Sequence, residues 1–463
     1  MIPPLILATF LLGTSTPADQ IENSRWWEQP VARLTNSTSP IVLPPAPIHD
    51  PRSYGAKGDG MTYDTEAIQK AIDACGGSGG SVVFSPGRYL TAELTLKGGM
   101  TFHLGKGAVL VGGTNAADYP VLFPSGSSAG ANKRSLLYAA VANNLTIDGA
   151  GEIDGRCKEV QMSGVESERP SLLRIFQSTN VTVRDITLRN PRMWTQVYSE
   201  CSHLLMERVK VEAPPDCPNL DGIDICDCGE VVIRDCVINS EDDAICLKSH
   251  GGRGLRNILV ENNAIRSYRA NAIKLGTASA GPVSGIVFRN NVVSGAKYGG
   301  LCLESVDGSI VKDITVDGLE MKSVSQPLFL RLAHRSNLPG SMDGILIENV
   351  RVTEPGNETR PSSSITGIPE AKMGNVTLRN CYLQMPGGMA SIPPSPPEHE
   401  KDYPQSNIVG DPPASVLYVR HATNVILDHV VVSVAQPDAR PWLVAEDAEV
   451  QTNSCIQTGT KTP

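Results

Sequence analysis

The sequence predicts an all-β fold, a single-domain right-handed parallel β-helix with an N-terminal capping helix. Short runs of β-forming residues recur along most of the chain, with Asn, Asp or Gly between them. From Val181 to Ile286 these runs begin 23 to 28 residues apart. A repeat of this length that holds several strands is typical of a β-solenoid. A β-sandwich is the alternative, but it would not repeat one unit so many times.

Length and composition agree with a solenoid. The chain has 463 residues, which would suit two or three average domains, but a solenoid of this length forms one body. It contains 43 Gly and 34 Pro, and this content favours turns over long helices. We assign residues 48–450 to the β-helix, which is expected to be the catalytic domain.

The N-terminus resembles a secretory signal. Residues 1–18 start with an apolar stretch and then become small and polar, although no Lys or Arg precedes the stretch. The alternative is a hydrophobic leader of another origin. Residues 19–47 are rich in Pro and Ser and are expected to form a linker or extended arm. We therefore expect a secreted or periplasmic protein, and no later run reaches the ~20 apolar residues of a membrane span.

A helix is predicted ahead of the first strand. Asp64 is the expected N-cap, and apolar residues follow with helical spacing from Ala67 to Ile72. Gly76 ends the pattern, and Ser81 begins the first strand. An amphipathic helix here would cover the open end of the first coil, as a solenoid requires.

A second set of strands keeps register with the first. Runs beginning at Asp221, Asp243, Asn271 and Gly299 are separated by 22, 28 and 28 residues. Because side chains alternate between the two faces of a strand, one set should stack inside the coil and one outside. The expected inner column is Ile223, Ile245, Ile273 and Leu301. The expected outer column is Asp224, Cys246, Lys274 and Cys302.

The C-terminal part contains an irregular segment. Residues 384–413 include eight Pro and should form a loop excursion that caps an end or walls a cleft. Residues 451–463 are expected to be a flexible tail.

Cysteine usage does not indicate a metal site. The eleven Cys include no pair of C-x-x-C motifs, which argues against zinc. Cys228 and Cys236 are close enough in sequence for a disulfide, whereas most other cysteines fit as small residues in strands.

The net charge of −9 argues against a nucleic-acid partner, because phosphate binding needs a basic surface. It does not exclude an acidic polysaccharide, which a local basic cleft could bind. The number of subunits stays open.

Three carboxylates mark the candidate catalytic site. Asp221, Asp242 and Asp243 stand about one repeat apart at the starts of apolar runs. Like charges at close range raise each other's pKa, so such clustering is costly unless it serves a purpose. Glycoside hydrolysis needs an acid and a base of this type. The structural alternative is that they are corner residues of the coils.

At these residues the chain resembles glycoside hydrolase family 28, the polygalacturonase-like family of the pectin-lyase-like superfamily. The resemblance covers about residues 46–450. It rests on Asn219-Leu220-Asp221 and Asp242-Asp243, with Gly151 to Gly155, Arg169-Pro170 and Trp194-Thr195 before them. It implies an inverting glycosidase that acts on a pectic or related polysaccharide. Asp242 would be the general acid, Asp221 and Asp243 would activate water, and neither a metal nor another cofactor is required.

Two family motifs differ here. Asn271 stands where the family carries a catalytic-site His, and Cys302-Leu303-Glu304 replaces Arg-Ile-Lys, which binds the galacturonate carboxylate. The segments around Arg331 and Tyr418 resemble a divergent bacterial branch. The sugar at the cleaved bond, and endo or exo action, therefore stay open.

Several polar residues are candidates for substrate binding. Lys248 and Lys274 are the cations that could meet a substrate carboxylate, and a solvated surface lysine is the alternative for each. Asn271 could hydrogen-bond the water or the leaving group, and His250 could contact sugar or cap a turn. The full set is Asn219, Lys248, His250, Asn271, Lys274, Arg331 and His334, the last two at one edge of the cleft.

Two other functions compete with hydrolysis. A polysaccharide lyase of the same fold would need a calcium-binding acid cluster and an Arg or Lys base. A non-catalytic carbohydrate-binding β-helix would be expected to lose the acid pair, which this chain keeps.

Overall fold

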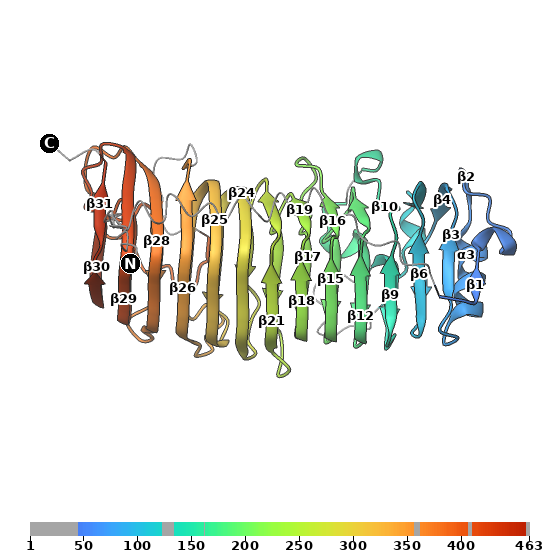
Figure 1. Ribbon diagram of the computed structural model, residues 1–463. Helices are drawn as coiled ribbons and strands as arrows, with labels where there is room; N and C mark the ends of the chain where they lie inside the picture. The colour runs from blue at the N-terminus through green and yellow to red at the C-terminus, as the bar shows by residue number, and fades with distance from the viewer. Residues whose placement is uncertain (1–44, 123–133, 162, 356–361, 406–409, 460–463) are drawn as a thin grey trace, which may run out of the picture.

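The protein forms one elongated stack of β-strand coils (Figure 1). The computed structural model describes residues 45–122, 134–161, 163–355, 362–405 and 410–459. Successive coils pair through parallel ladders. A crossover connection between parallel strands of one sheet is almost always right-handed. The predicted right-handed parallel β-helix is therefore confirmed. The expected leader and residues 19–44 of the expected linker lie outside the described residues.

The N-terminal end is closed by a helix. After β1 (Ile48–His49), η1 (Pro51–Tyr54) and β2 (Asp59–Tyr63), helix α3 (Thr65–Cys75) packs its apolar stripe on the first coil. Its buried residues are Ile68, Ala71, Ile72 and Cys75. The capping helix is confirmed, but the Asp64 side chain does not cap it. Its carboxylate instead accepts hydrogen bonds from the backbone of Lys57 and Gly58, at 2.6 and 2.9 Å, and so holds the preceding loop.

The coils follow in chain order from α3 to the C-terminal end. The first coils contain β3 (Ser81–Phe84), β4 (Gly87–Thr91), β5 (Leu94–Leu96), β6 (Met100–Leu104), β7 (Ala108–Gly112), η2 (Ala116–Asp118), β8 (Ser135–Ala140), β9 (Leu145–Asp148), β10 (Glu152–Asp154), η3 (Cys157–Glu159) and η4 (Glu166–Glu168). The middle coils contain β11 (Ser171–Phe176), β12 (Thr179–Arg184), β13 (Thr187–Arg189), β14 (Gln196–Ser199), β15 (Ser202–Glu207), β16 (Lys210–Glu212), β17 (Ile223–Cys226), β18 (Gly229–Arg234), β19 (Val237–Ser240), β20 (Ile245–Lys248), β21 (Leu255–Glu261), β22 (Ala264–Ser267) and β23 (Ile273–Leu275). The last coils contain β24 (Val283–Ser305), β25 (Ile310–Leu332), β26 (Ser341–Thr353), β27 (Ser363–Thr366), β28 (Met373–Gly387), β29 (Leu417–Gln436), β30 (Leu443–Asn453) and β31 (Ile456–Thr458).

The predicted columns are present in the ladder formed by β17, β20, β23 and β24. The inner column runs from Ile223 through Ile245 and Ile273 to Leu301, each paired with the next. All four side chains are buried. Their neighbours on the opposite face form the second column of Asp224, Cys246, Lys274 and Cys302. The repeat lengths read from the sequence thus set the register of this sheet.

A stack of buried asparagines stabilises one corner of the coils. Asn263 donates from Nδ2 to the carbonyl of Ile233 at 3.1 Å and to Oδ1 of Asn291 at 3.0 Å. Its own Oδ1 accepts from the backbone N–H of Cys236 at 2.9 Å. These amides pair backbone groups that the bend of the chain takes out of the strand ladders.

Replacing Asn263 by Ala should lower the free energy of unfolding by roughly 2–4 kcal/mol, because buried backbone groups lose their partners. Chemical denaturation of the variant and the wild type measures this difference. Asn239→Ala, at a half-buried outward position of β19, is the matched control and should change stability little. Equal stability of Asn263→Ala and the wild type would contradict the role of the stack.

The eleven cysteines are free thiols. Cys228 and Cys236, which are close enough in sequence for a bridge, instead direct their thiols to carbonyl oxygens within the coil, those of Cys226 at 3.2 Å and Arg234 at 3.2 Å. Both are fully buried and fill space in the core.

The C-terminal residues extend the stack. Residues 451–458, assigned from the sequence to a tail, belong to β30 and β31 except for the turn between them. The Pro-rich excursion leaves the coil after β28 and returns at β29. No helix in the described ranges has the length and apolar character needed to span a bilayer.

Candidate active site

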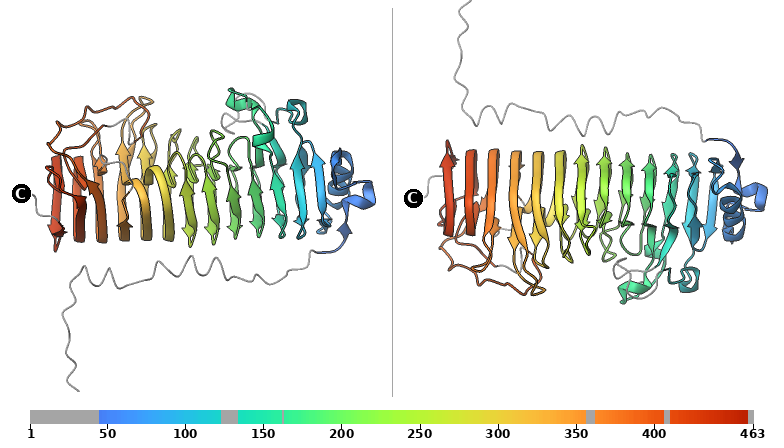
Figure 2. Two further views of the ribbon diagram at one scale, coloured as in Figure 1. Left: turned by 90° about the horizontal axis from the view of Figure 1, so that it is seen from above. Right: turned by 90° about the horizontal axis from the view of Figure 1, so that it is seen from below.

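The candidate active site is a cleft over β17, β20 and β23. Figure 2 shows the loops that follow β10 and β28 projecting on the same side of the stack, on either side of these middle coils. The cleft has a volume of about 520 Å³. Its lining consists of Glu166, Trp194, Asn219, Asp221, Asp242, Asp243, Lys248, His250, Lys274, Thr277, Ala278 and Tyr403. The structure therefore brings the three predicted catalytic carboxylates together.

The turn before β17 has a strict local geometry. Asn219 adopts a left-handed conformation with φ of 60°, which its short amide side chain tolerates. A Cβ atom at Gly222 would lie 2.4 Å from the carbonyl oxygen of Ala244, so only glycine fits there. Arg169 fixes the turn by donating to the carbonyl of Pro218 and to Oδ1 of Asn219, both at 2.8 Å. This arrangement directs Asp221 into the cleft.

Asp243 is surrounded by hydrogen-bond donors. Its Oδ1 accepts from the backbone N–H of Asn271 at 3.2 Å and from the Asn271 side chain at 2.7 Å. Its Oδ2 lies 3.2 Å from the Lys274 ammonium. Both oxygens of the Asp243 side chain are therefore engaged by neighbouring groups of the protein.

Asp242 is the more accessible member of the pair. Its side chain is 21 % exposed, and Oδ2 lies 3.1 Å from the Arg269 guanidinium. Burial and the charge of Asp243 raise the pKa of Asp242, against the opposite effect of Arg269. A carboxyl group with a raised pKa is suited to general-acid catalysis.

Asp221 is buried, and among the described residues its Oδ1 has no hydrogen-bond partner. Burial and the carboxylates of Asp224 and Asp242 raise the pKa of Asp221 well above its ordinary value. The nearest cation is Lys248, whose Nζ lies 3.8 Å from Oδ2. Asp221 nevertheless lines the cleft, so its carboxyl group borders the space where a substrate would lie.

Lys248 is a buried structural cation rather than a solvated one. Its Nζ donates to Oδ1 of Asp224 at 2.6 Å and lies 3.6 Å from the centre of the Trp194 ring. Burial alone would lower the pKa of Lys248, but Asp224 and the other neighbouring anionic groups raise it well above its ordinary value. Lys248 therefore carries a positive charge that Asp224 balances.

Lys274 is held in a similar way. Besides Asp243, its Nζ donates to the hydroxyl of Tyr403 at 3.0 Å and lies 5.0 Å from the centre of that ring. Tyr403 belongs to the Pro-rich excursion and is 129 residues away in sequence. The sequence predicts that this excursion caps an end or walls a cleft, but it does not indicate this tyrosine, because no local pattern links the two segments. The sequence likewise indicates Trp194 only as part of a motif.

Asn271, Arg331 and His334, which were predicted to bind substrate, do not line the cleft. The Asn271 amide is occupied by Asp243 and by the backbone N–H of Gly299 at 2.9 Å. Arg331 donates to Thr366 at 3.3 Å and to the carbonyls of Gly367 and Glu398. These contacts place it, with His334, beneath the Pro-rich excursion, whose Lys401 donates to the carbonyl of His334 at 2.6 Å.

The other predicted binding residues have clear positions. His250 lines the cleft, where burial and the nearby Lys248 lower the pKa of its imidazole and favour the neutral form. Glu304, in the coil whose motif departs from the family pattern, is buried behind the lining. Burial raises the pKa of Glu304 to about 8.

Two buried thiols lie beside the turn before β17. Cys217 Sγ is 3.3 Å from Cys157 Sγ, in a small cluster with Ala213 and Leu220. Oxidised glutathione should convert this pair to a disulfide, with release of two molecules of reduced glutathione. The reaction should take hours because burial raises the pKa of Cys157 and so keeps its thiol protonated.

Mass spectrometry of a non-reduced digest should show the linked peptides, and the chain-entropy model predicts a stabilisation of about 4 kcal/mol for a loop of this length. Cys157→Ser should abolish the link. Complete alkylation of both thiols after the oxidation would contradict the expectation.

The protein is thus a parallel β-helix that gathers three carboxyl groups in one cleft. The model of Glycosyl hydrolases family 28 matches residues 81–389, and the chain belongs to this family. The protein is therefore a glycosidase, and the predicted family is confirmed.

Similar proteins carry related names. A probable polygalacturonase of Vitis vinifera is 25 % identical over 369 residues, which cover 73 % of this chain and 75 % of that one. An exo-poly-alpha-D-galacturonosidase of Dickeya chrysanthemi is 28 % identical, with coverage of 52 % and 54 %. The structure of a family 28 exopolygalacturonase from Yersinia enterocolitica aligns with a TM-score of 0.66 and 20 % identity, covering 89 % of this chain and 78 % of that one. This alignment shows the shared fold.

Proposed function

We propose that the protein hydrolyses a glycosidic bond of a pectic polysaccharide with inversion at the anomeric carbon. Asp242 is the general acid, and Asp221 and Asp243 hold and activate the attacking water. The observation that carries the proposal is the different surroundings of two neighbouring carboxyl groups. Asp243 is engaged by the Asn271 amide and the Lys274 ammonium, whereas Asp242 is more accessible and burial raises its pKa.

The proposed reaction follows from this arrangement of the three carboxyl groups. Asp242 gives its proton to the glycosidic oxygen as the bond to the anomeric carbon breaks. Water attacks that carbon from the opposite face, and Asp243 takes the proton that the water loses. Asp221, which lines the cleft beside Asp242 and Asp243, helps to position the water.

The pairing of the lysines favours hydrolysis over β-elimination. A lyase needs an uncharged Lys or Arg as base, or a cation bound by the acids. Neighbouring carboxylates raise the pKa values of both Lys248 and Lys274, so neither is a base near neutral pH. We therefore place the lyase second. Export directed by residues 1–18 would bring the enzyme to such polymers and forms part of the proposal.

The purified enzyme should be tested on homogalacturonan, rhamnogalacturonan I and de-esterified side-chain fractions. New reducing ends without ultraviolet absorbance from unsaturated uronides would support a hydrolase, and NMR of the first-formed anomer would test inversion. Unsaturated products that a chelator suppresses would indicate a lyase. Lack of activity on every fraction would contradict a pectic substrate.

A further inference from the structure

The two lysines of the cleft form ion pairs within the protein. Lys248 pairs with Asp224 at 2.6 Å, and Lys274 pairs with Asp243 at 3.2 Å. Arg269, beside the cleft, pairs with Glu241 at 2.6 Å and with Asp242 at 3.1 Å. A uronate ring over the catalytic carboxylates would add a negative charge where, among the described residues, both lining lysines already have carboxylate partners. The cleft is therefore better suited to an uncharged ring.

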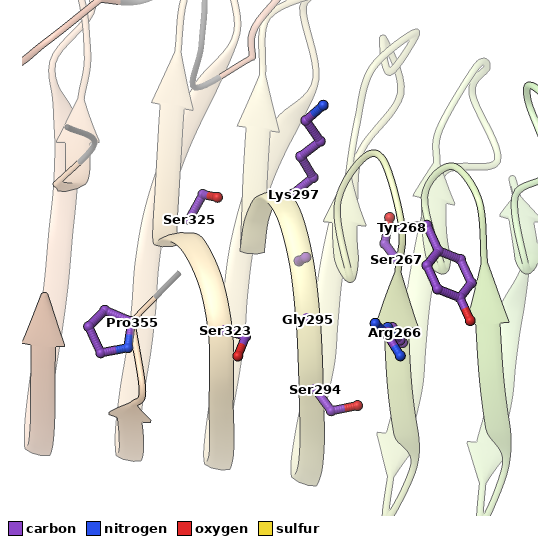
Figure 3. Close-up of a pocket in the computed structure, with 10 residues that line it drawn as sticks. Arg266, Ser267, Tyr268, Ser294, Gly295, Lys297, Ser323, Ser325 and Pro355 are labelled. Carbon is purple, nitrogen blue, oxygen red and sulfur yellow. The ribbon is translucent and has the colours of Figure 1, made fainter. Parts of the chain in front are cut away.

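A second groove lies next to Asp242, on the outside of β22, β24 and β25 (Figure 3). It has a volume of about 560 Å³. Its wall includes Ser267, whose hydroxyl donates to the backbone carbonyl of Asp242 at 2.8 Å. Arg269, two residues further on, reaches the Asp242 carboxylate. One short segment thus forms a wall of the groove and also contacts the proposed general acid.

The cations that line the groove are exposed, unlike the buried lysines of the cleft. Arg266 and Lys297 are both exposed and line it, and neither forms an ion pair with any part of the chain that the structure describes. The Arg266 guanidinium lies 4.7 Å from the centre of the Tyr268 ring, which gives it an orientation. Figure 3 shows Arg266, Ser294 and Ser323 on three neighbouring strands, so both serine hydroxyls lie on the same side of Arg266, along the groove. Guanidinium and hydroxyl donors together suit a carboxylate and its sugar ring.

We propose that this groove binds uronates of the substrate chain, with one carboxylate at Arg266 and another at Lys297, whose side chain extends away from Arg266 (Figure 3), while an uncharged sugar ring occupies the cleft over the three carboxylates. The inference rests on the proposed function and names its substrate class, an acidic polymer in which uronate and neutral sugars occur together. It also explains how an acidic protein whose described cleft lysines are both paired could bind an acidic polymer.

The test compares Arg266→Gln and Lys297→Gln with the wild type on rhamnogalacturonan I and on the same polymer after chemical reduction of its carboxyl groups. Loss of one exposed charge contact should raise KM on the acidic polymer about fivefold and leave kcat unchanged. On the reduced polymer the variants and the wild type should have equal KM values. Arg289→Gln is the matched control, since Arg289 is an outward arginine of β24 that lines neither the groove nor the cleft.

Unchanged KM in both variants on the acidic polymer would overturn the inference, as would products with uronates on both sides of every cleaved bond. Failure of the proposed function gives a different result, because the wild type would then release no products from any pectic fraction. In that case, calorimetric titration of the wild type and of Arg266→Gln with acidic oligosaccharides still tests whether the groove binds uronates. Weaker binding by Arg266→Gln than by the wild type supports the groove, and equal or undetectable binding by both overturns it.

Discussion

Replacing Asp242 by Asn is expected to lower kcat on a pectic substrate by roughly 10²–10⁴-fold, the usual contribution of a general acid. Asn has nearly the same shape but cannot give a proton to the leaving oxygen. The loss should be much smaller on an aryl glycoside of the accepted sugar, because a good leaving group departs without protonation. Steady-state kinetics on the two substrates measures this difference.

Asp243→Asn is the matched control and should be impaired on both substrates, since activation of the water does not depend on the leaving group. Equal losses for Asp242→Asn on the two substrates would contradict the assignment of Asp242 as the acid.

The same variants should differ in pH dependence. Activity requires protonated Asp242, so the raised pKa of Asp242 sets the alkaline limb above the range of an ordinary carboxyl group. Asp242→Asn should lose that limb.

Lys248→Met is expected to destabilise the protein by about 3–5 kcal/mol at neutral pH, because it leaves Asp224 buried without its cation. Asp224 is fully buried, and its Oδ2 has no other hydrogen-bond partner among the described residues. Denaturant unfolding at several pH values measures the effect. The double variant Lys248→Met with Asp224→Asn should recover part of the loss, since it removes both charges.

The pH dependence of this variant has a definite sign. Burial already raises the pKa of Asp224, and loss of Lys248 should raise it further. A carboxyl group with a higher pKa in the folded state than in the unfolded state loses stability as pH rises between the two values. The penalty of Lys248→Met should therefore be small near pH 4 and largest at neutral pH. A penalty independent of pH would show that packing against Trp194, rather than charge, is what Lys248 provides.

The coil register could be predicted because it is a local property. A strand side chain alternates faces with a period of two, and each coil repeats the same pattern, so Ile223 and Ile245 had to stack once the repeat length was known. The three carboxylates could be placed in one cleft for the same reason. The position of Asn271 below Asp243 also follows from the register, but its hydrogen bonds to Asp243 and Gly299 do not.

The sequence by itself determined the fold, the capping helix and the set of acids, since all three depend on periodicity and spacing within one repeat. Only the tertiary structure decided which cations have carboxylate partners. From the sequence, Lys248 and Lys274 could each bind a substrate carboxylate. In the structure each forms an ion pair with a carboxylate one coil away, Asp224 and Asp243 respectively. Tyr403 reaches Lys274 across 129 residues through an irregular loop. Such loops carry no repeat, so their contacts depend on packing of the whole chain rather than on local pattern.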